Sequence, residues 1–202
     1  MGENLHDHLH TRVNHEVRNV RTLNNIMRNP LAKAMMALRL MVAGNGFMSC
    51  SGQIIHALAR SRPGEPVPDL KLQLHWLSSP DARDPRRILL DDCPGISIGT
   101  FPLRPKSRGA VHIRSADVYT PPMMQANYLA HEDDRRVAVA GLRLARRLAE
   151  QPALAPWIVR EIKPGPDAAS DEELLDYIRS IGQTSYHPVG SCRMGTDAAS
   201  VV

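Results

Sequence analysis

The sequence predicts an α+β fold in which an antiparallel sheet is flanked by helices. Residues 9–17 and 69–77 alternate apolar and polar side chains, which is typical of strands that are covered on one face. Residues 132–150 and 170–181 instead repeat apolar side chains at helical spacing. Sixteen prolines and thirteen glycines among 202 residues interrupt the chain too often for a long-helix or coiled-coil architecture.

The first predicted strand, residues 9–17, carries β-branched residues at several odd-numbered positions. Its opposite face is polar and consists of His8, His10, Arg12 and Asn14. Residues 23–38 show helical spacing, and we expect Pro30 to divide that helix into two pieces. We interpret residues 44–49 as a turn and residues 54–58 as a short helical return.

The next predicted strand, residues 69–77, has one apolar face that consists of Leu70, Leu72, Leu74 and Trp76. Residues 78–95 are rich in turn-forming residues, which indicates a surface excursion. Two further strands follow at 96–103 and 110–114. The short connection between them contains Gly109, and it predicts that the two strands pair as an antiparallel hairpin.

Two helices complete the predicted fold. The helix at 132–150 has an apolar face that consists of Val137, Ala140, Leu144, Ala145 and Leu148. Its remaining surface carries Arg135, Arg136, Arg143, Arg146 and Arg147, and we interpret it as a solvated face. A capping box from Ser170 to Glu173 predicts the start of the last helix, and Gly182 is suited to end it.

Composition excludes several classes of protein. The formal charge of +4 comes from 25 basic and 21 acidic residues, and the eight aromatic residues are scattered, so we expect no nucleic-acid partner. No stretch approaches the roughly 20 apolar residues of a membrane span, and the N-terminus does not resemble a secretory signal. Three cysteines without a CxxC pair fit a reducing compartment, so we expect a cytoplasmic location.

One loop, residues 184–195, combines an imidazole with residues that fix the backbone. Pro188 favours an extended backbone at His187, and Gly190 and Gly195 permit turns or close approach to another group. Such a loop can hold an imidazole at a pocket wall, where its titration near neutrality suits general acid or base catalysis. From these residues alone, a histidine that merely hydrogen-bonds within its loop is the simpler interpretation.

Residues 186–195 read Tyr-His-Pro-Val-Gly-Ser-Cys-Arg-Met-Gly, and this stretch resembles the histidine signature of the glucose-methanol-choline (GMC) family of flavin-dependent oxidoreductases. It differs from that pattern only at Ser191. Three more elements resemble the family in the same order along the chain: residues 2–9, 103–117 and 127–134. The resemblance implies the fold of the family's substrate-binding domain, without the Rossmann-type flavin-binding core.

The same resemblance implies a reaction. It implies that the protein oxidises the CH–OH group of a small alcohol by hydride transfer to FAD, with His187 as general acid or base. Tyr186 and Val189 are candidate residues of the substrate pocket, and packing within the loop is an equal alternative for both. The alcohol stays open among choline, aliphatic alcohols and sugars, as does the choice between oxygen and a quinone-type electron acceptor.

Two elements of that family are absent from the sequence: the Gly-x-Gly-x-x-Gly dinucleotide turn and the C-terminal return segment. We therefore expect a fragment in which residues 1–22 link to a flavin domain and residues 23–181 form the substrate-binding domain. Residues 182–202 would form the catalytic-histidine loop and the start of the return segment. We expect this chain alone to bind flavin weakly or not at all. The missing flavin-binding portion or a second copy of the chain could then cover an exposed face.

Three alternatives stay open. A metal site could involve the histidines His6, His8, His10 and His15, but no carboxylate or cysteine at suitable spacing completes it, so we expect none. Cys192 and His187 could form a nucleophile and base, although such partners are rarely neighbours in sequence. The chain could also be a non-catalytic remnant, or a domain that binds a small molecule or a protein partner without flavin.

Overall fold

The computed structural model describes residues 1–50, 52–80, 89–198 and 200–201. The strands are β1 (Leu9–Val17), β2 (Gln53–Ala59), β3 (Leu70–His75), β4 (Gly95–Pro102), β5 (Ala110–His112), β6 (Met123–Gln125), β7 (Ile158–Lys163) and β8 (Gln183–Thr184). The helices are α1 (Leu23–Arg28), α2 (Pro30–Ala43), α3 (Glu132–Ala149) and α4 (Asp171–Ile181). Two short 3₁₀ turns are η1 (Phe47–Ser49) and η2 (Ala155–Trp157).

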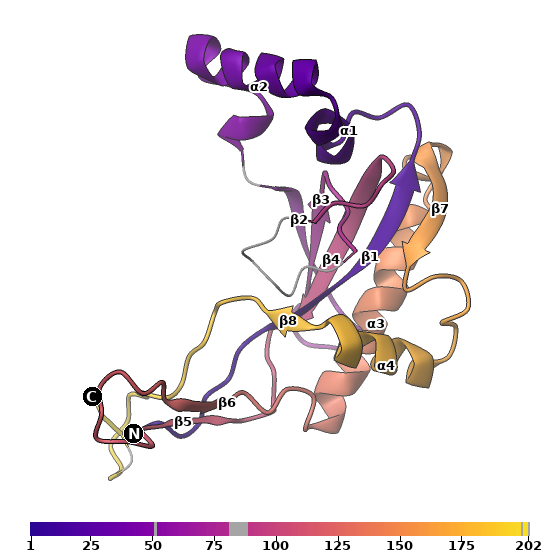
Figure 1. Ribbon diagram of the computed structural model, residues 1–202. Helices are drawn as coiled ribbons and strands as arrows, with labels where there is room; N and C mark the ends of the chain where they lie inside the picture. Colours follow the sequence, from indigo (N-terminus) through magenta and orange to yellow (C-terminus); the bar gives the residue numbers. More distant parts are fainter. Residues whose placement is uncertain (51, 81–88, 199, 202) are drawn as a thin grey trace.

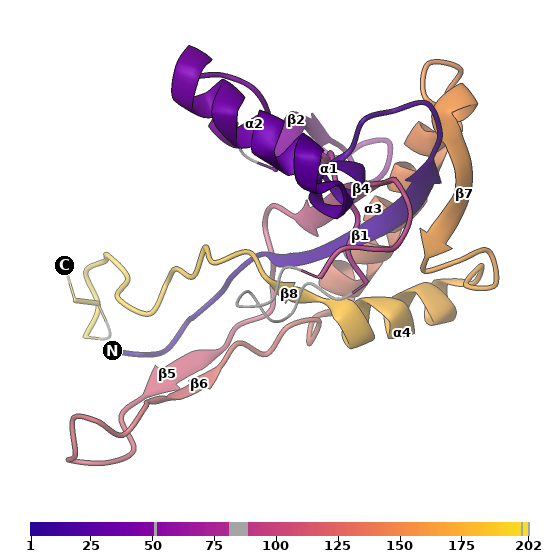
Figure 2. The same ribbon diagram turned by 45° about the horizontal axis from the view of Figure 1, so that its top comes forward.

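The main sheet has the strand order β2-β3-β4-β1-β7, and β8 pairs with the start of β1 (Figure 1). Every strand pairing that the structure describes is antiparallel. Helices α3 and α4 lie on one side of this sheet, and the β5–β6 ribbon extends away from it (Figures 1 and 2). The predicted α+β class and antiparallel sheet are confirmed.

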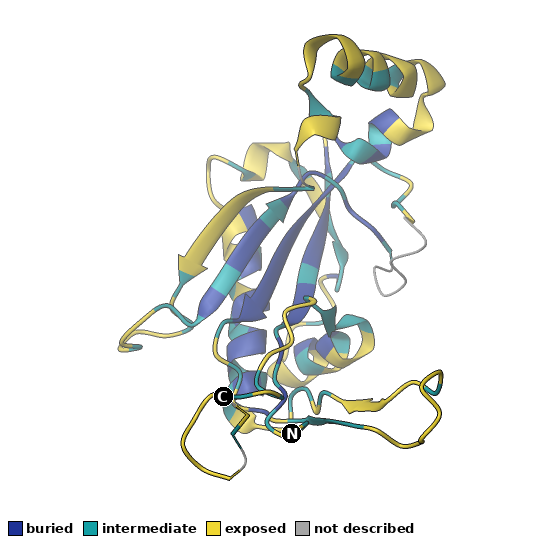
Figure 3. Cartoon of the chain, turned by 90° about the vertical axis from the view of Figure 1, so that its left-hand side faces the viewer, coloured by how far each residue is buried: buried dark blue, intermediate teal, exposed yellow. Residues whose placement is uncertain are grey.

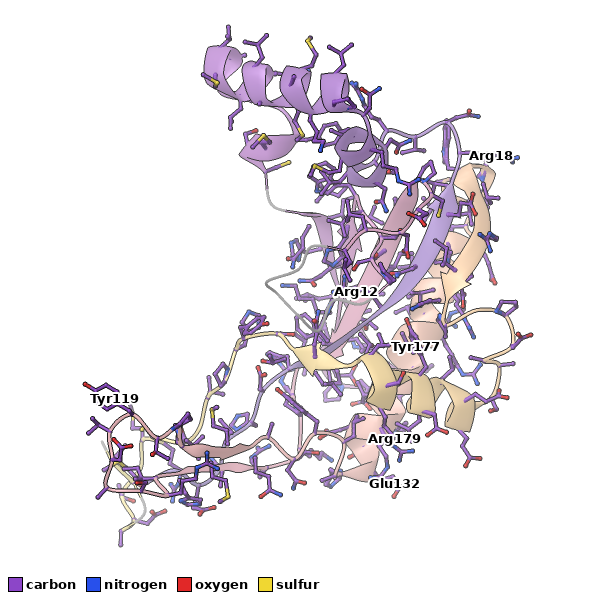
Figure 4. All side chains as sticks on the ribbon, in the orientation of Figure 1. Arg12, Arg18, Tyr119, Glu132, Tyr177 and Arg179 are labelled. Atoms are coloured by element: carbon purple, nitrogen blue, oxygen red, sulfur yellow. The ribbon has the colours of Figure 1, made fainter. Side chains whose placement is uncertain are left out.

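Strand β1 lies between β4 and β7 and fixes the two faces of the sheet. Val13 lies opposite Ile98 of β4, and both side chains are buried against the helical side. Arg12 lies opposite Gly99, on the other face, as the alternation along residues 9–17 predicts. Tyr177 of α4 donates its hydroxyl hydrogen to the backbone oxygen of Arg12 at 2.8 Å, which ties α4 to β1 (Figure 4).

The core lies between the sheet and α3 (Figure 3). Leu142 and Ala145 are fully buried, and Gly141 lies so close to β4 that a Cβ there would be 2.5 Å from Oγ1 of Thr100. The predicted apolar face of α3 is partly wrong, because the buried positions centre on Leu142 whereas Leu148 is 38% exposed. Arg146 is not solvated either, since it forms a largely buried ion pair of 2.7 Å with Glu161.

Two sequence predictions about strands are wrong. Residues 54–58 lie within strand β2 and not in a helix, because pairing with β3 overrides a short apolar pattern that suits either structure. The expected hairpin between residues 96–103 and 110–114 does not form, since β4 pairs with β1 and β3 while β5 pairs with β6. The backbone N–H groups of Lys106 and Ser107 donate to the Asp134 carboxylate at 2.7 Å, which holds the connection against the start of α3.

Several local signals are confirmed. Pro30 begins α2 after Asn29, whose side chain accepts from the first backbone N–H groups of the helix, and Gly44 ends it in the left-handed region (φ +63°). The capping box from Ser170 to Glu173 is present at the start of α4. Within the predicted excursion 78–95, residues 81–88 lie outside the described residues, and its first two serines are buried and not at the surface.

The division of the chain at residues 22 and 181 stays a prediction. The first of those parts contains β1, which pairs with β4, β7 and β8. In the described ranges, no helix has the length and apolar character needed to cross a membrane.

Replacing Leu142 by alanine is expected to lower the free energy of unfolding by about 2–5 kcal/mol, because it leaves a cavity in the core under β4. Leu148→Ala on the same helix is the matched control, and its partly exposed side chain should cost about 1 kcal/mol or less. Urea unfolding followed by far-ultraviolet circular dichroism measures both. Equal losses in the two variants would contradict the assigned core face.

Candidate functional site

The N-terminal segment, residues 2–8, holds the loop at 184–195 by backbone hydrogen bonds. His6 and Val189 exchange two such bonds of 2.9 Å, as an isolated bridge between the two segments. Gly190 has a φ of +95°, and a Cβ there would lie 2.2 Å from a backbone oxygen of the N-terminal segment. The loop can approach this closely only because the position is glycine.

The other side of the N-terminal segment contacts the chain ahead of β5. Leu5 and Gly109 exchange backbone hydrogen bonds of 2.9 and 2.7 Å. A Cβ at Gly109 would lie 1.9 Å from the backbone oxygen of Gln125, the last residue of β6, so only glycine fits at this position. Segments far apart in the sequence therefore meet beside the chain termini (Figures 1 and 2).

Asp7 forms a side-chain clamp at this junction. Its buried carboxylate accepts hydrogen bonds from the hydroxyls of Tyr128 and Thr184, and from the backbone N–H of His187 at 3.0 Å. Burial by itself raises the pKa of Asp7, but these hydrogen bonds outweigh burial and leave the pKa below its ordinary value. Burial and the bond to Asp7 raise the pKa of Tyr128 to about 12. The clamp is therefore charged at neutral pH, and it fixes the backbone of His187.

The side chain of His187 is exposed. Its ring meets His8 edge-on, with ring centroids 5.6 Å apart, and lies 6.3 Å from the ring of Phe101. Within the part of the chain that the structure describes, neither ring nitrogen makes a hydrogen bond. The preceding residue, Tyr186, has a φ of +60°, a strained conformation for an aromatic residue that sets the direction of the chain as it enters His187.

His8 has a defined tautomer. Its Nδ1 lies 2.6 Å from the backbone oxygen of Pro102, and a carbonyl oxygen can only accept a hydrogen bond. The neutral ring therefore keeps its proton on Nδ1 and leaves Nε2 as an acceptor. The ring also packs against Phe101, with centroids 4.8 Å apart, so it is a fixed neighbour of His187.

From His8, the polar face of the sheet continues along β1 to the neighbouring strands. His10 of β1 and His75 of β3 lean over Gly99, where a Cβ would lie 2.4 and 3.0 Å from their Nε2 atoms. Both nitrogens are buried and have no hydrogen-bond partner among the described residues. Burial, helped by the charge of Arg12, holds the pKa of His10 well below its usual range and lowers that of His75 to about 4. Both rings are therefore neutral near pH 7.

Phe101 joins the buried and exposed parts of this face. Its ring lies near His10 on one side, and the Nζ atom of Lys71 stands 5.6 Å from its centroid. The arrangement is a polar sheet face on β1, β3 and β4 whose His10, His75 and Phe101 are buried, with the exposed imidazole of His187 at its edge. Only this edge, at His187, is open to a bound molecule among the groups described here.

A family model described as GMC oxidoreductase matches residues 105–202. The alcohol dehydrogenase [acceptor] of Pseudomonas putida is 33% identical to this chain over 203 residues, which cover 100% of the chain and 36% of that enzyme.

The chain belongs to the GMC oxidoreductase family.

Two further comparisons agree with this assignment to the GMC family. Choline oxidase of Arthrobacter globiformis is 48% identical over 103 residues, which cover 50% of the chain and 19% of that enzyme. A solved structure of formate oxidase from Aspergillus oryzae has the same fold, with a TM-score of 0.80 at 17% identity over 95% of the chain and 37% of that protein. The chain thus spans about a third of the length of relatives that it matches from end to end.

For this GMC chain, the predicted pocket residues lie at the surface beside His187. The side chains of Tyr186 and Val189 are 65% and 54% exposed, and the contact of Val189 with the N-terminal segment is made through its backbone. Their role in a substrate pocket stays a prediction. A separate, mainly apolar cavity of about 570 Å³ is lined in part by Phe47, Trp76 and Trp157, and not by the histidine loop.

The N-terminal histidines have separate surroundings. His6 contacts the backbone oxygen of Asn4 through Nδ1, whereas His15 is buried on the helical side of the sheet. Among the described residues, no group of three or more histidines, cysteines or carboxylates is placed to hold a metal ion. Cys192 is exposed, and within the described chain no hydrogen bond links it to His187.

Sequence reasoning missed the clamp and the buried imidazole pair. Asp7 lies in one of the elements that resemble the family, but its three donors come from distant segments. The polar positions that alternate with leucine along β3 were a usable signal for His75. Nothing in the sequence indicated that Gly99 makes room for the rings of His10 and His75.

Asp7→Asn is expected to loosen the histidine loop, because the amide loses the charge that strengthens these hydrogen bonds. We expect a loss of about 1–3 kcal/mol in the free energy of unfolding and a roughly tenfold faster hydrogen exchange at the His187 amide. Asp176→Asn, at an exposed carboxylate paired with Arg179, is the control and should change neither. Hydrogen exchange followed by mass spectrometry tests this, and unchanged protection of the loop in Asp7→Asn would contradict it.

Acid should destabilise the fold before its carboxylates protonate. His75 has a pKa of about 4 in the folded chain and 6.5 in the unfolded chain, so the unfolded state takes up the proton first as pH falls. The free energy of unfolding should be level above pH 7 and fall by about 2–3 kcal/mol between pH 6.5 and 4 on account of this residue. Urea unfolding across this range should show a smaller pH slope in His75→Gln. An equal slope in both proteins would refute the assignment.

Proposed function

We propose that this chain forms the substrate-binding part of an FAD-dependent oxidoreductase that oxidises the CH–OH group of a small alcohol. The observation that carries the proposal is the exposed imidazole of His187, which the Asp7 clamp fixes at the edge of the polar sheet face. Family membership supports it, as do relatives named alcohol dehydrogenase and choline oxidase. The chain spans only part of those relatives, and we propose that the activity belongs to a longer protein.

The described residues fit the flat ring system of FAD, but they do not fit its pyrophosphate. The described sheet is antiparallel, and it contains no parallel β-α-β unit of the kind whose glycine-rich turn binds a dinucleotide pyrophosphate. By contrast, the exposed ring of His187 beside His8 leaves a surface that a flat ring system can approach. We propose that the dinucleotide is held by another part of a longer chain, and that His187 stands over its reactive end.

Alcohol oxidation removes a proton from the hydroxyl oxygen and a hydride from the carbon that bears it. The bound flavin supplies the hydride acceptor. His187 takes the hydroxyl proton onto a free ring nitrogen, which leaves negative charge on the oxygen and favours loss of the hydride. The hydrogen bond of its backbone to Asp7 and the edge contact with His8 limit the freedom of the ring, so the imidazole is already oriented when substrate arrives.

The polar face gives the substrate side of the proposed site. The neutral rings of His10 and His75 are buried on this face, so we propose that the substrate contacts its exposed edge at His187 and not their ring nitrogens. Tyr186 and Val189 flank His187 and would contact the substrate from the loop. We also propose a cytoplasmic location, which the three free cysteines support.

His187→Gln is the direct test, in the chain joined in frame to the flavin-binding part of the Pseudomonas putida alcohol dehydrogenase. We expect kcat to fall by about 10²- to 10⁴-fold with short-chain alcohols and an artificial electron acceptor, while flavin absorbance stays unchanged. The pH–rate profile should also lose the limb that the wild-type residue contributes.

The control variant is His131→Gln, at the exposed N-cap of α3, which should keep its activity. Full turnover in His187→Gln would refute the role of this residue. A chimera that binds flavin and oxidises none of the alcohols would favour a non-catalytic remnant or a binding domain.

A further inference from the structure

Helix α2 stands out from one end of the molecule (Figures 1 and 2). None of its residues is buried, although all of them except Lys33 and Arg39 have apolar side chains. Apolar and sulfur-containing side chains project from it into solvent (Figure 4). A helix of this kind exposes apolar surface that monomeric soluble proteins normally cover.

The apolar residues of α2 form two faces. One face is half-buried and consists of Ala32, Met36, Ala37 and Leu40. The other, which we call the outer stripe, consists of Leu31, Met35, Leu38 and Val42. Their spacings of four, three and four residues place these four side chains in one line along the helix, with exposed fractions of 71, 56, 52 and 78%. The outer stripe thus faces away from the protein along the whole helix.

Exposed methionines also occur outside the outer stripe. Met27 of α1 is 39% exposed, Met41 near the end of α2 is 83% exposed, and Met48 of η1 is 52% exposed. Exposed apolar side chains therefore occur on α1, α2 and η1. Fourteen residues in α2 are too few to cross a bilayer, but they suit a helix that lies flat at its surface.

The stretch of sequence that forms this surface is basic, although Arg28 pairs with Asp92 and Arg62 pairs with Glu65 from outside it. The 48 residues from 17 to 64 contain no aspartate or glutamate, and they contain seven basic residues: Arg18, Arg21, Arg28, Lys33, Arg39, Arg60 and Arg62. The rest of the chain has 18 basic and 21 acidic residues, so the bias is local. A symmetric contact between two copies through the outer stripe would bring like charges together. An anionic surface is the complementary partner.

We propose that α2 docks on a membrane surface that contains anionic lipids. The outer stripe enters the boundary between headgroups and acyl chains, with Arg39 beside it at the level of the phosphates and Lys33 on the opposite side of the helix, within range of the surface charge. The histidine loop and both chain termini lie at the opposite end of the molecule from α2, so docking leaves them uncovered (Figures 1 and 2). This inference concerns a surface apart from the candidate active site and does not depend on the proposed reaction.

Vesicle co-sedimentation of the 202-residue chain tests the proposal. Vesicles of phosphatidylcholine with one third phosphatidylglycerol should bind the chain, and pure phosphatidylcholine vesicles should bind it roughly tenfold more weakly. The double variant Leu38→Ser/Val42→Ser should bind the anionic vesicles at least about tenfold more weakly. Lys33→Gln/Arg39→Gln should lose most of the preference for anionic vesicles, and high salt should have the same effect.

The matched control is Ile113→Ser/Val118→Ser, which removes two exposed apolar side chains from the region between β5 and β6. It should bind like the wild type, and circular dichroism checks that every variant is folded. Equal binding by the outer-stripe variant would overturn the proposal, as would equal binding to both vesicle types or absence of binding. A dimer in sedimentation velocity that Leu38→Ser/Val42→Ser converts to a monomer would instead assign the outer stripe to a second copy.

Discussion

The carboxylate of Asp7 is the contact on which the candidate site depends. It joins the start of the chain to Tyr128, ahead of α3, and to Thr184 and His187, at the end of the sheet. A buried carboxylate is costly unless donors surround it, and the three donors satisfy that need together. The same bonds that offset its burial also position the backbone of His187, so stability and site geometry have one origin here.

Glycines determine how closely the surrounding segments approach. Gly190 lets the histidine loop approach the N-terminal segment, and Gly109 lets the chain ahead of β5 approach the end of β6. Gly99 provides the space in which His10 and His75 lean over the sheet. In each position a Cβ would overlap neighbouring atoms, so the lack of a side chain is what brings the polar groups together.

The molecule has two separate surfaces to which we assign a function. One end carries the exposed imidazole of His187, whose backbone the Asp7 clamp holds. The other end carries the apolar outer stripe of α2, within a stretch of sequence, residues 17–64, that contains no aspartate or glutamate. The central antiparallel sheet separates them, so substitutions at α2 can be studied without disturbing His187 (Figure 1).

Local sequence signals determined much of this structure. Pro30, Gly44 and the capping box at Ser170 set helix boundaries, because backbone sterics and hydrogen bonding act within a few residues. Alternation identified β1 and β3, and the motif around His187 identified the family and the residue on which the proposed chemistry depends. The sequence did not indicate which strands pair. In sequence, β4 and β5 resemble a hairpin, but the bonds from the backbone of Lys106 and Ser107 to Asp134 hold their connection against the start of α3. The clamp, the imidazole pair over Gly99 and the outward face of α2 were decided only by the tertiary structure, because each depends on groups that are distant in sequence and adjacent in space.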